Sequence, residues 1–160
     1  DSRYLFMLCV TLQRPKSVGK VSLASADPAD QPRIDINLLA EEADMARMMD
    51  GVRVAWRLLN SPPIASKTAE VLGPPAAVVE DDAMLRGFLR ERVSHLVHPV
   101  GTCKMGPSGD PLAVVDATGR VHGMEGLRVA DAAIMPNIPR ANTNLTAIMI
   151  GERIAAMMRS

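Results

Sequence analysis

Apolar residues recur every three or four positions between Glu41 and Leu59, the spacing that places side chains on one face of an α-helix. These residues are Met45, Met48, Val52, Ala55, Trp56 and Leu59. Acidic side chains fill the first turn, where the helix dipole favours them. The pattern stops at Ser61-Pro62-Pro63, because proline interrupts a helix. We therefore predict that the longest helix covers residues 41–59.

Two further segments have a helical pattern. One runs from about Asp81 to Ser94 and begins with acidic residues, and the other runs from Asn144 to Met158. The residues expected to face inward are Met84, Leu85, Phe88 and Leu89 in the first, and Leu145, Ile148, Met149 and Ile154 in the second. Gly73-Pro74-Pro75 predicts a loop before the first of these helices.

Strand patterns lie on both sides of these helices. Tyr4–Leu12 is continuously apolar, residues 18–23 alternate, and a polar segment containing Pro15 separates the two, which predicts a pair of antiparallel strands. A turn-rich loop is expected over Asp27–Pro32. Residues 113–122 predict a tight hairpin, and residues 126–131 predict a buried strand. Together these elements indicate an α+β fold, an antiparallel sheet with covering helices.

Composition narrows the classes of partner. The chain has 160 residues, of which 48% are hydrophobic, and its 18 basic residues balance 18 acidic ones. This balance, with only 2% aromatic residues, argues against nucleic acid as a partner. Cys9 and Cys103 lie far apart, so neither a disulfide framework nor a metal site is expected. No apolar run reaches the roughly 18 residues of a membrane span, and no signal peptide is visible.

The strongest candidate for chemistry is a polar segment around His98, His98-Pro99-Val100-Gly101-Thr102-Cys103-Lys104-Met105-Gly106. Histidine titrates near neutral pH, which suits it to accept the proton of an alcohol. Pro99 fixes the neighbouring backbone, and glycines bracket a compact loop. His95 and His122 are interpreted as structural. An alternative is that Cys103 is a nucleophile activated by its basic neighbour, but no supporting third group is apparent.

A second polar segment, Asn142-Thr143-Asn144, precedes the last helix. Asparagine is a preferred residue at a helix start, so one of the two is expected to cap the helix. The free N–H groups there also stabilise a developing anion, and the Asn142 amide suits a substrate hydroxyl. Asp131 closes the predicted strand 126–131, where it either caps a turn or accepts a hydrogen bond from a ribityl or ribose hydroxyl.

These motifs together resemble the C-terminal region of the glucose–methanol–choline (GMC) oxidoreductases, with the choline dehydrogenase-like and alcohol dehydrogenase-like branch the most similar. The resemblance rests on the His98 segment, on Gly123–Ala132, on Asn142–Asn144 with Ile148–Arg153, and on the entry segment Arg14–Val21. It therefore covers nearly the whole chain, with its motifs in the family's order.

The resemblance implies a two-domain α/β flavoenzyme. Residues 1–109 would belong to the substrate domain, and residues 110–160 would return to complete a Rossmann-like FAD domain. It further implies that His98 takes the hydroxyl proton of an alcohol while hydride passes to flavin N5. Asn142 would be the second catalytic position. The positions implied to contact FAD are Asp131, Ala132, Asn142, Thr143 and Asn144.

One part of the family pattern is missing. No G-x-G-x-x-G follows a strand, so the chain has no recognisable cradle for a pyrophosphate. The chain also opens on Asp1 rather than Met, and we expect a segment of a longer protein that alone binds FAD weakly or not at all and has no turnover. Its expected partners are an alcohol, an N-terminal FAD-binding part and an electron acceptor such as oxygen or a quinone. The expected location is cytoplasmic or membrane-peripheral. The alternative is a non-catalytic binding module with the same fold.

Overall fold

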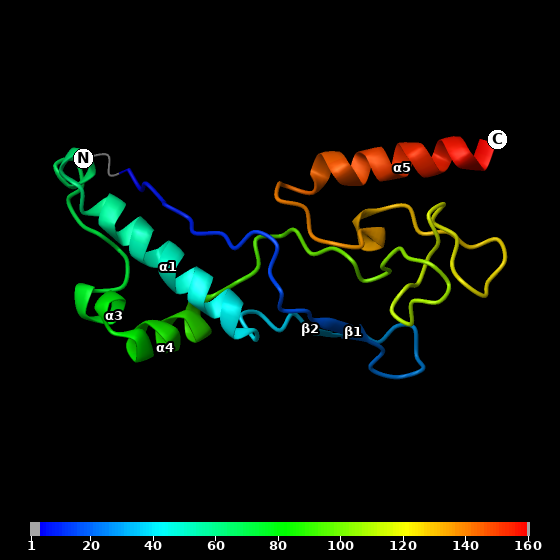
Figure 1. Cartoon of the computed structure of the whole chain (residues 1–160), viewed down its shortest axis with the longest axis horizontal. Coiled ribbons are helices and arrows are strands. Elements are labelled where there is room, and N and C mark those ends of the chain that lie inside the picture. Colours follow the sequence, from blue (N-terminus) through cyan, green and yellow to red (C-terminus); the bar gives the residue numbers. More distant parts are fainter. Residues whose placement is uncertain (1–3, 160) are drawn as a thin grey trace. The chain divides into compact units, whose positions relative to one another are not determined.

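The computed structural model describes residues 4–159, and these form two compact units (Figure 1). Unit 1 contains residues up to Val18 together with Asn37–Ser94. Unit 2 contains Gly19–Ile36 and the chain from His95 onward. The fold is α+β as predicted, with helices and one antiparallel pair of strands in the described part of the chain.

Helices form the core of unit 1. The predicted long helix is confirmed as α1 (Glu42–Leu59), and the predicted helix after residue 80 is confirmed as α4 (Asp82–Arg92). Two short helices that the pattern did not predict lie between them, α2 (Pro62–Ala65) and α3 (Ala76–Glu80). The two longer helices meet in an apolar cluster of buried side chains, Met45, Met48, Met49, Leu85 and Leu89.

The start of α4 follows from local sequence. The Asp81 carboxylate accepts a hydrogen bond of 2.8 Å from the Met84 backbone N–H, which caps the helix. Leu85 and Leu89 face inward as predicted, whereas Met84 is 51% exposed and was assigned wrongly. Met84 lies beside the buried stripe on the helix surface, where apolarity alone does not determine burial.

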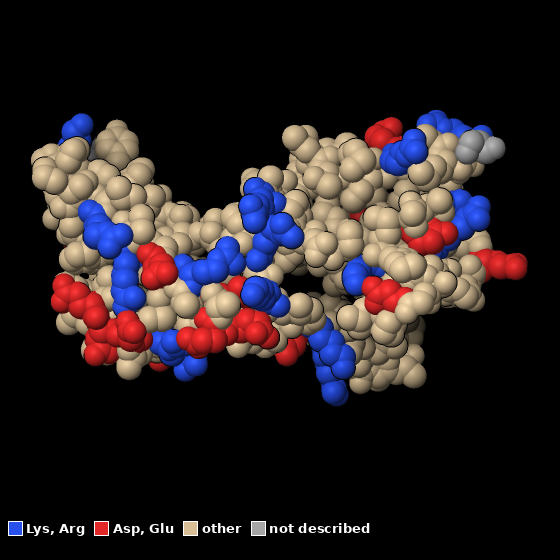
Figure 2. Space-filling view, viewed as in Figure 1, with Lys and Arg blue, Asp and Glu red and all other residues tan. Residues whose placement is uncertain are grey.

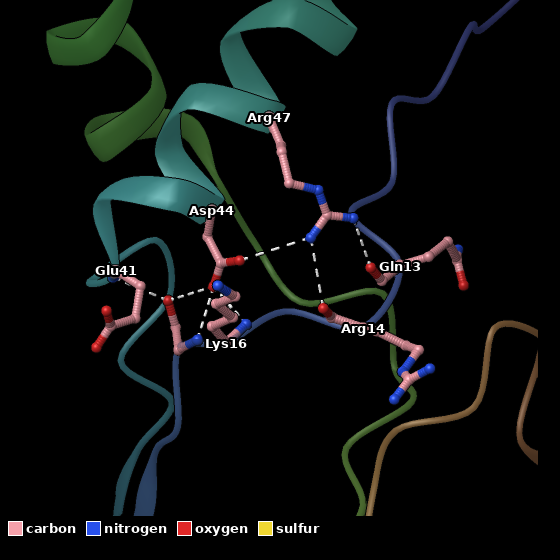
Figure 3. Close-up of polar contacts among 7 residues, drawn as sticks. Gln13, Arg14, Lys16, Glu41, Asp44 and Arg47 are labelled. Carbon is pink, nitrogen blue, oxygen red and sulfur yellow. Dashed lines mark hydrogen bonds and ion pairs between the residues drawn. The ribbon is translucent and has the colours of Figure 1, made fainter.

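A buried carboxylate joins the N-terminal segment of unit 1 to α1 (Figure 3). Asp44 Oδ2 accepts hydrogen bonds from the backbone N–H groups of Lys16 and Ser17, at 2.7 and 2.6 Å, and from the Ser17 hydroxyl at 2.7 Å. Arg47 Nη1 lies 3.8 Å from Asp44 Oδ1, and its other nitrogen donates to the Gln13 carbonyl. Asp44 thus fixes residues 13–17 against the first turn of α1.

The same contacts determine how Asp44 titrates. Burial by itself raises the pKa of the carboxyl, but the hydrogen bonds from Lys16 and Ser17 and the charge of Arg47 outweigh it. The net result is a lowered pKa for Asp44, which therefore remains a carboxylate in the folded chain.

Charges cover much of the remaining surface of unit 1. Figure 2 shows acidic and basic side chains intermixed over this helical region. Two ion pairs link helices there: Arg86 with Glu42, at 2.6 Å, and Arg53 with Asp82. Exposed ion pairs of this kind contribute little to stability. The stability of unit 1 therefore depends mainly on the apolar cluster and on the hydrogen bonds of Asp44.

The predicted strand Tyr4–Leu12 does not form. Residues 4–12 have no strand in the structure, and Tyr4 is 95% exposed. The segment 18–23 does contain a strand, β1 (Lys20–Ser22), but its antiparallel partner is β2 (Arg33–Asp35) across the predicted turn-rich loop. An apolar run becomes a strand only where another strand satisfies its backbone groups, and β2 takes that place.

Loops dominate unit 2 around a second apolar cluster of Val115, Ile134, Met135, Ile150 and Ile154. The predicted hairpin turn is present, with the Gly119 N–H donating to the Asp116 carbonyl at 3.0 Å, but its arms make only the single pair Val115–Val121. Gly119 has φ +76°, and a Cβ there would lie 2.6 Å from the Val129 carbonyl oxygen. Only glycine fits this turn.

Two predictions about the C-terminal part need correction. The buried strand expected over residues 126–131 is an irregular segment with one bridge, Arg120–Arg128, and Leu127 is 46% exposed. The last helix is confirmed as α5 (Asn144–Arg159), and Ile154 faces inward as predicted, but the other residues predicted to face inward do not. Ile150 and Ile154 are buried, whereas Leu145, Ile148 and Met149 are exposed. The helix is apolar on most sides, so its sequence pattern did not select one face.

Candidate active site

His98 follows a strained backbone position in unit 2. Val97 has φ +46°, a left-handed conformation that β-branched residues rarely adopt. Such strain collects at functional sites, where the surrounding structure fixes it. Three residues after His98, Gly101 has φ +84°, and a Cβ there would lie 3.1 Å from the Met135 carbonyl oxygen. The backbone conformations of Val97 and Gly101, on either side of His98, therefore fix the shape of the loop that carries it.

This loop is bonded to η1 (Ala132–Ile134), a short 3-10 helix. Its backbone N–H groups donate to consecutive carbonyls of η1, from Gly101 to Ala132 at 3.3 Å, from Cys103 to Ala133 at 2.9 Å, and from Met105 to Ile134 at 2.9 Å. The structure thus brings the His98 segment beside Asp131 and Ala132, which the sequence placed in a separate motif.

Asp131 starts η1. Its Oδ1 accepts a hydrogen bond of 2.7 Å from the Ala133 N–H, so the cap predicted as one of its two roles is present. The side chain is exposed, and in the described part of the chain Oδ2 has no hydrogen bond. That oxygen is free to accept from a hydroxyl group.

His98 also contacts the start of α5. Its Nδ1 lies 3.0 Å from Thr143 Oγ1, at hydrogen-bond distance. Thr143 is only 7% exposed, and its carbonyl accepts from the Ala147 N–H at 2.9 Å, which makes it the residue that opens the helix. Within the described residues, Nε2 of His98 has no hydrogen bond. One ring nitrogen is therefore held and the other is available for chemistry.

The neighbouring asparagines are placed differently from Thr143. Asn142 and Asn144 are both exposed, and their amides have no hydrogen-bond partner among residues 4–159. The predicted capping by an asparagine amide is thus not seen, since Thr143 occupies the position before α5. The exposed amides and the free N–H groups of the first helical turn suit an anionic or hydroxylated ligand.

The remaining candidates have structural roles. His122 Nε2 lies 3.0 Å from the Gly106 carbonyl, which fixes the hairpin to the His98 loop, and His95 Nδ1 accepts from the nearby Val97 N–H. Lys104 pairs with Asp110 at 2.6 Å, and its hydrogen bond lowers the pKa of that carboxyl. The basic neighbour of Cys103 is therefore paired with Asp110, and the Cys103 thiol has no hydrogen bond to any described residue.

Neither a metal site nor a membrane-spanning helix is found among the described residues. No cluster of three or more histidine, cysteine, aspartate or glutamate side chains is positioned to hold a metal ion. Among residues 4–159, no helix has both the length and the apolar character needed to cross a membrane.

One contact at the site was not predicted. The family resemblance implied that Thr143 contacts a cofactor, and the structure adds a hydrogen-bond contact between its hydroxyl and His98, 45 positions earlier in the chain. A threonine at the residue before a helix normally caps it, and the local pattern gave no sign of this other role.

The chain is similar to known proteins over nearly its whole length. A protein-family model described as GMC oxidoreductase matches residues 15–151. An oxygen-dependent choline dehydrogenase from Escherichia coli is 41% identical over 154 residues, which are 96% of this chain and 27% of that protein. One from Pseudomonas aeruginosa is 42% identical over 146 residues, 91% of this chain and 26% of that protein. The chain therefore spans about a quarter of the length of these curated relatives.

Solved structures are similar as well. A formate oxidase superposes with a TM-score of 0.81 at 31% identity, over 91% of this chain and 25% of its own. Pyridoxine 4-oxidase from Mesorbium loti superposes with a TM-score of 0.79 at 28% identity, over 92% of this chain and 28% of its own.

Proposed function

Because the chain belongs to the GMC oxidoreductase family, we propose that it is part of a larger FAD-dependent enzyme that oxidises the CH–OH group of a small alcohol. The observation that carries this proposal is the placement of His98. Its Nδ1 is bonded to Thr143, its loop is bonded to η1, and its Nε2 has no partner within the described chain. These contacts leave one basic nitrogen free beside the two segments implied to contact a flavin.

The residues present fit FAD. Asp131 has a free carboxylate oxygen for a sugar-like hydroxyl, and Ala132 adjoins it without a bulky side chain. The exposed amides of Asn142 and Asn144, with the N–H groups of the first turn of α5 and the backbone of Thr143, suit an electron-rich ring edge. The helix start also favours negative charge there.

The proposed reaction divides between cofactor and protein. Oxidation of an alcohol to a carbonyl removes a hydride from carbon and a proton from oxygen. When bound, FAD supplies the acceptor for the hydride. His98 Nε2 accepts the hydroxyl proton as general base, and the amide of Asn142 donates a hydrogen bond to the substrate oxygen. An amide does not act as a base, so proton removal depends on His98.

The rest of the enzyme is expected to cover exposed surface of this chain. The helix α5 has an exposed apolar face formed by Leu145, Ile148 and Met149. We propose that an N-terminal FAD-binding part covers this face. Residues 1–109 would then serve the substrate domain, and residues 110–160 would complete the FAD domain. The chain alone is expected to hold no stoichiometric flavin and to have no turnover, because it lacks a glycine-rich phosphate loop.

The experiment is a screen of the full-length protein, purified with its flavin, against alcohols and electron acceptors. Choline comes first, since relatives are choline dehydrogenases, followed by aromatic alcohols; oxygen and quinones serve as acceptors. We expect bound FAD and alcohol-dependent reduction of it. Fractionation of the source cells would test the proposed cytoplasmic or membrane-peripheral location. A full-length protein that binds no flavin would favour the non-catalytic binding module instead.

A further inference from the structure

Thr143 is an unusual residue at the start of a helix. At this position a threonine oxygen normally accepts a hydrogen bond from an N–H group in the first turn. The only hydrogen bond of the Thr143 hydroxyl to the described residues is instead the 3.0 Å contact with His98 Nδ1. The side chain is 7% exposed, so little water competes for this bond. Thr143 therefore makes no capping hydrogen bond, and its hydroxyl contacts the candidate base His98 instead.

This contact bears on which ring nitrogen carries the proton. A neutral imidazole has one N–H and one lone pair, and a base must present the lone pair to its substrate. If Nδ1–H donates to Thr143 Oγ1, the lone pair lies on Nε2, the nitrogen without a protein partner. After proton uptake both nitrogens are donors, and the bond to Thr143 persists unchanged. The same geometry thus serves the ring before and after the transfer.

We propose that Thr143 is a positioning residue for His98, which holds the Nδ1–H tautomer and the ring orientation so that Nε2 accepts the substrate proton. This inference rests on the proposed function, and it deepens the same site. It also gives the Thr143 side chain a role separate from the cofactor contact implied by the family resemblance, which its backbone can still make.

The test compares three variants of the full-length, flavin-loaded protein. Thr143→Val removes the hydroxyl and keeps the branched shape, and Thr143→Ser keeps the hydroxyl. Thr102→Val is the matched control, because Thr102 is exposed in the loop that carries His98 and its side chain has no hydrogen bond to the described residues. Thr143→Val is expected to lower kcat by about 10- to 100-fold with little change in KM, since misplacement of a reacting group costs rate rather than binding. Thr143→Ser should keep most of the wild-type kcat.

The second readout does not depend on activity. Nitrogen NMR of the protein with labelled histidine identifies the protonated ring nitrogen of neutral His98, and we expect Nδ1–H in the wild type and in Thr102→Val. Thr143→Val should release the ring into a mixture of tautomers. An Nε2–H wild type, an unchanged tautomer in Thr143→Val, or equal loss in the valine and serine variants would overturn the positioning role. Absence of alcohol oxidation with the expected tautomer shift would instead refute the proposed function alone.

Discussion

Asp44 in unit 1 and Thr143 in unit 2 are the buried polar side chains of the described chain, and they are used differently. Asp44 binds three donors on one oxygen and ties an irregular segment to a helix. Thr143 makes one bond, and it leaves the far nitrogen of His98 open. A buried polar group that binds several donors strengthens packing, whereas one that binds a single ring nitrogen of a histidine leaves the other open, as the proposed base requires.

The structures that surround Asp44 and Thr143 differ as well. Unit 1 buries its methionines and leucines between α1 and α4, so its shape comes from helix packing. Unit 2 has few regular elements near His98, and its loops are held by backbone hydrogen bonds to η1 and by glycines at positive φ. Functional side chains are commonly carried on loops that a rigid support positions, and unit 2 has this arrangement.

The largest effect on stability is expected from Asp44→Ala. Loss of the carboxylate leaves the N–H groups of Lys16 and Ser17 and the Ser17 hydroxyl without their partner, which should lower the free energy of unfolding by about 3 kcal/mol. Urea unfolding followed by Trp56 fluorescence measures it, because Trp56 is the single tryptophan and lies on α1. Asp50→Ala, exposed on the same helix, should stay within about 0.5 kcal/mol of the wild type. Equal midpoints for both variants would contradict the role of Asp44.

In unit 2 the matching change is Gly119→Ala. The new Cβ would meet the Val129 carbonyl oxygen at 2.6 Å in a backbone conformation of φ +76°, and we expect a loss of about 2 kcal/mol. Gly123→Ala is the control, since Gly123 has φ +74° with open space around it and should lose only about 1 kcal/mol. Hydrogen exchange of the segments around Val115 and Ile154 measures both. Similar protection in the two variants would show that steric contact at Gly119 is unimportant.

Acid should weaken unit 1 through Asp44. The folded pKa of this carboxyl is lowered from the ordinary value of 3.8, so its contribution is complete above 3.8 and is lost as the pH falls through the lower folded value. Trp56 unfolding midpoints measured from neutral pH down to acid should therefore fall more steeply in the wild type than in Asp44→Asn. Parallel pH curves for the two proteins would rule out Asp44 as the source of the acid sensitivity.

The smallest effect is expected at Val97. Glycine relieves the left-handed strain at φ +46° but adds chain entropy, so Val97→Gly should stabilise unit 2 locally by about 1 kcal/mol. Hydrogen exchange near His98 measures this, and Leu96→Gly is a control at an exposed neighbour without positive φ. A destabilised Val97→Gly variant would show that the position carries no strain.

The elements that depend on a local residue pattern were predicted correctly from the sequence. The amphipathic spacing of α1 and the acidic start of α4 were sufficient to place both helices. Residues 4–12 had strand character but no partner, because the partner of β1 lies at Arg33–Asp35. Three of the four residues predicted to face inward on α5 were wrong for a related reason, since apolar residues surround the helix and tertiary contacts bury Ile150 together with the correctly predicted Ile154.

The candidate site was likewise predicted only in part from the sequence. His98 and Asn142 stood out in the sequence because they lie in two polar segments, and Asp131 because it ends a predicted strand. The bonds that gather them join residues 31 or more positions apart, from Gly101 to Ala132 and from His98 to Thr143. No local periodicity encodes such contacts. The roles of His98 and Asn142, and of the residues expected to bind FAD, stay predictions until they are measured.

The most direct measurement is the rate at which an alcohol substrate reduces the bound flavin in the full-length His98→Ala protein without oxygen. If Nε2 of His98 takes the hydroxyl proton, this rate should fall by about 10²- to 10⁴-fold while flavin stays bound. His95→Ala, at an exposed histidine whose ring makes only a local bond, should keep the wild-type rate. A flavin-loaded His98→Ala protein that is reduced at the wild-type rate would contradict the assignment of His98 as the base.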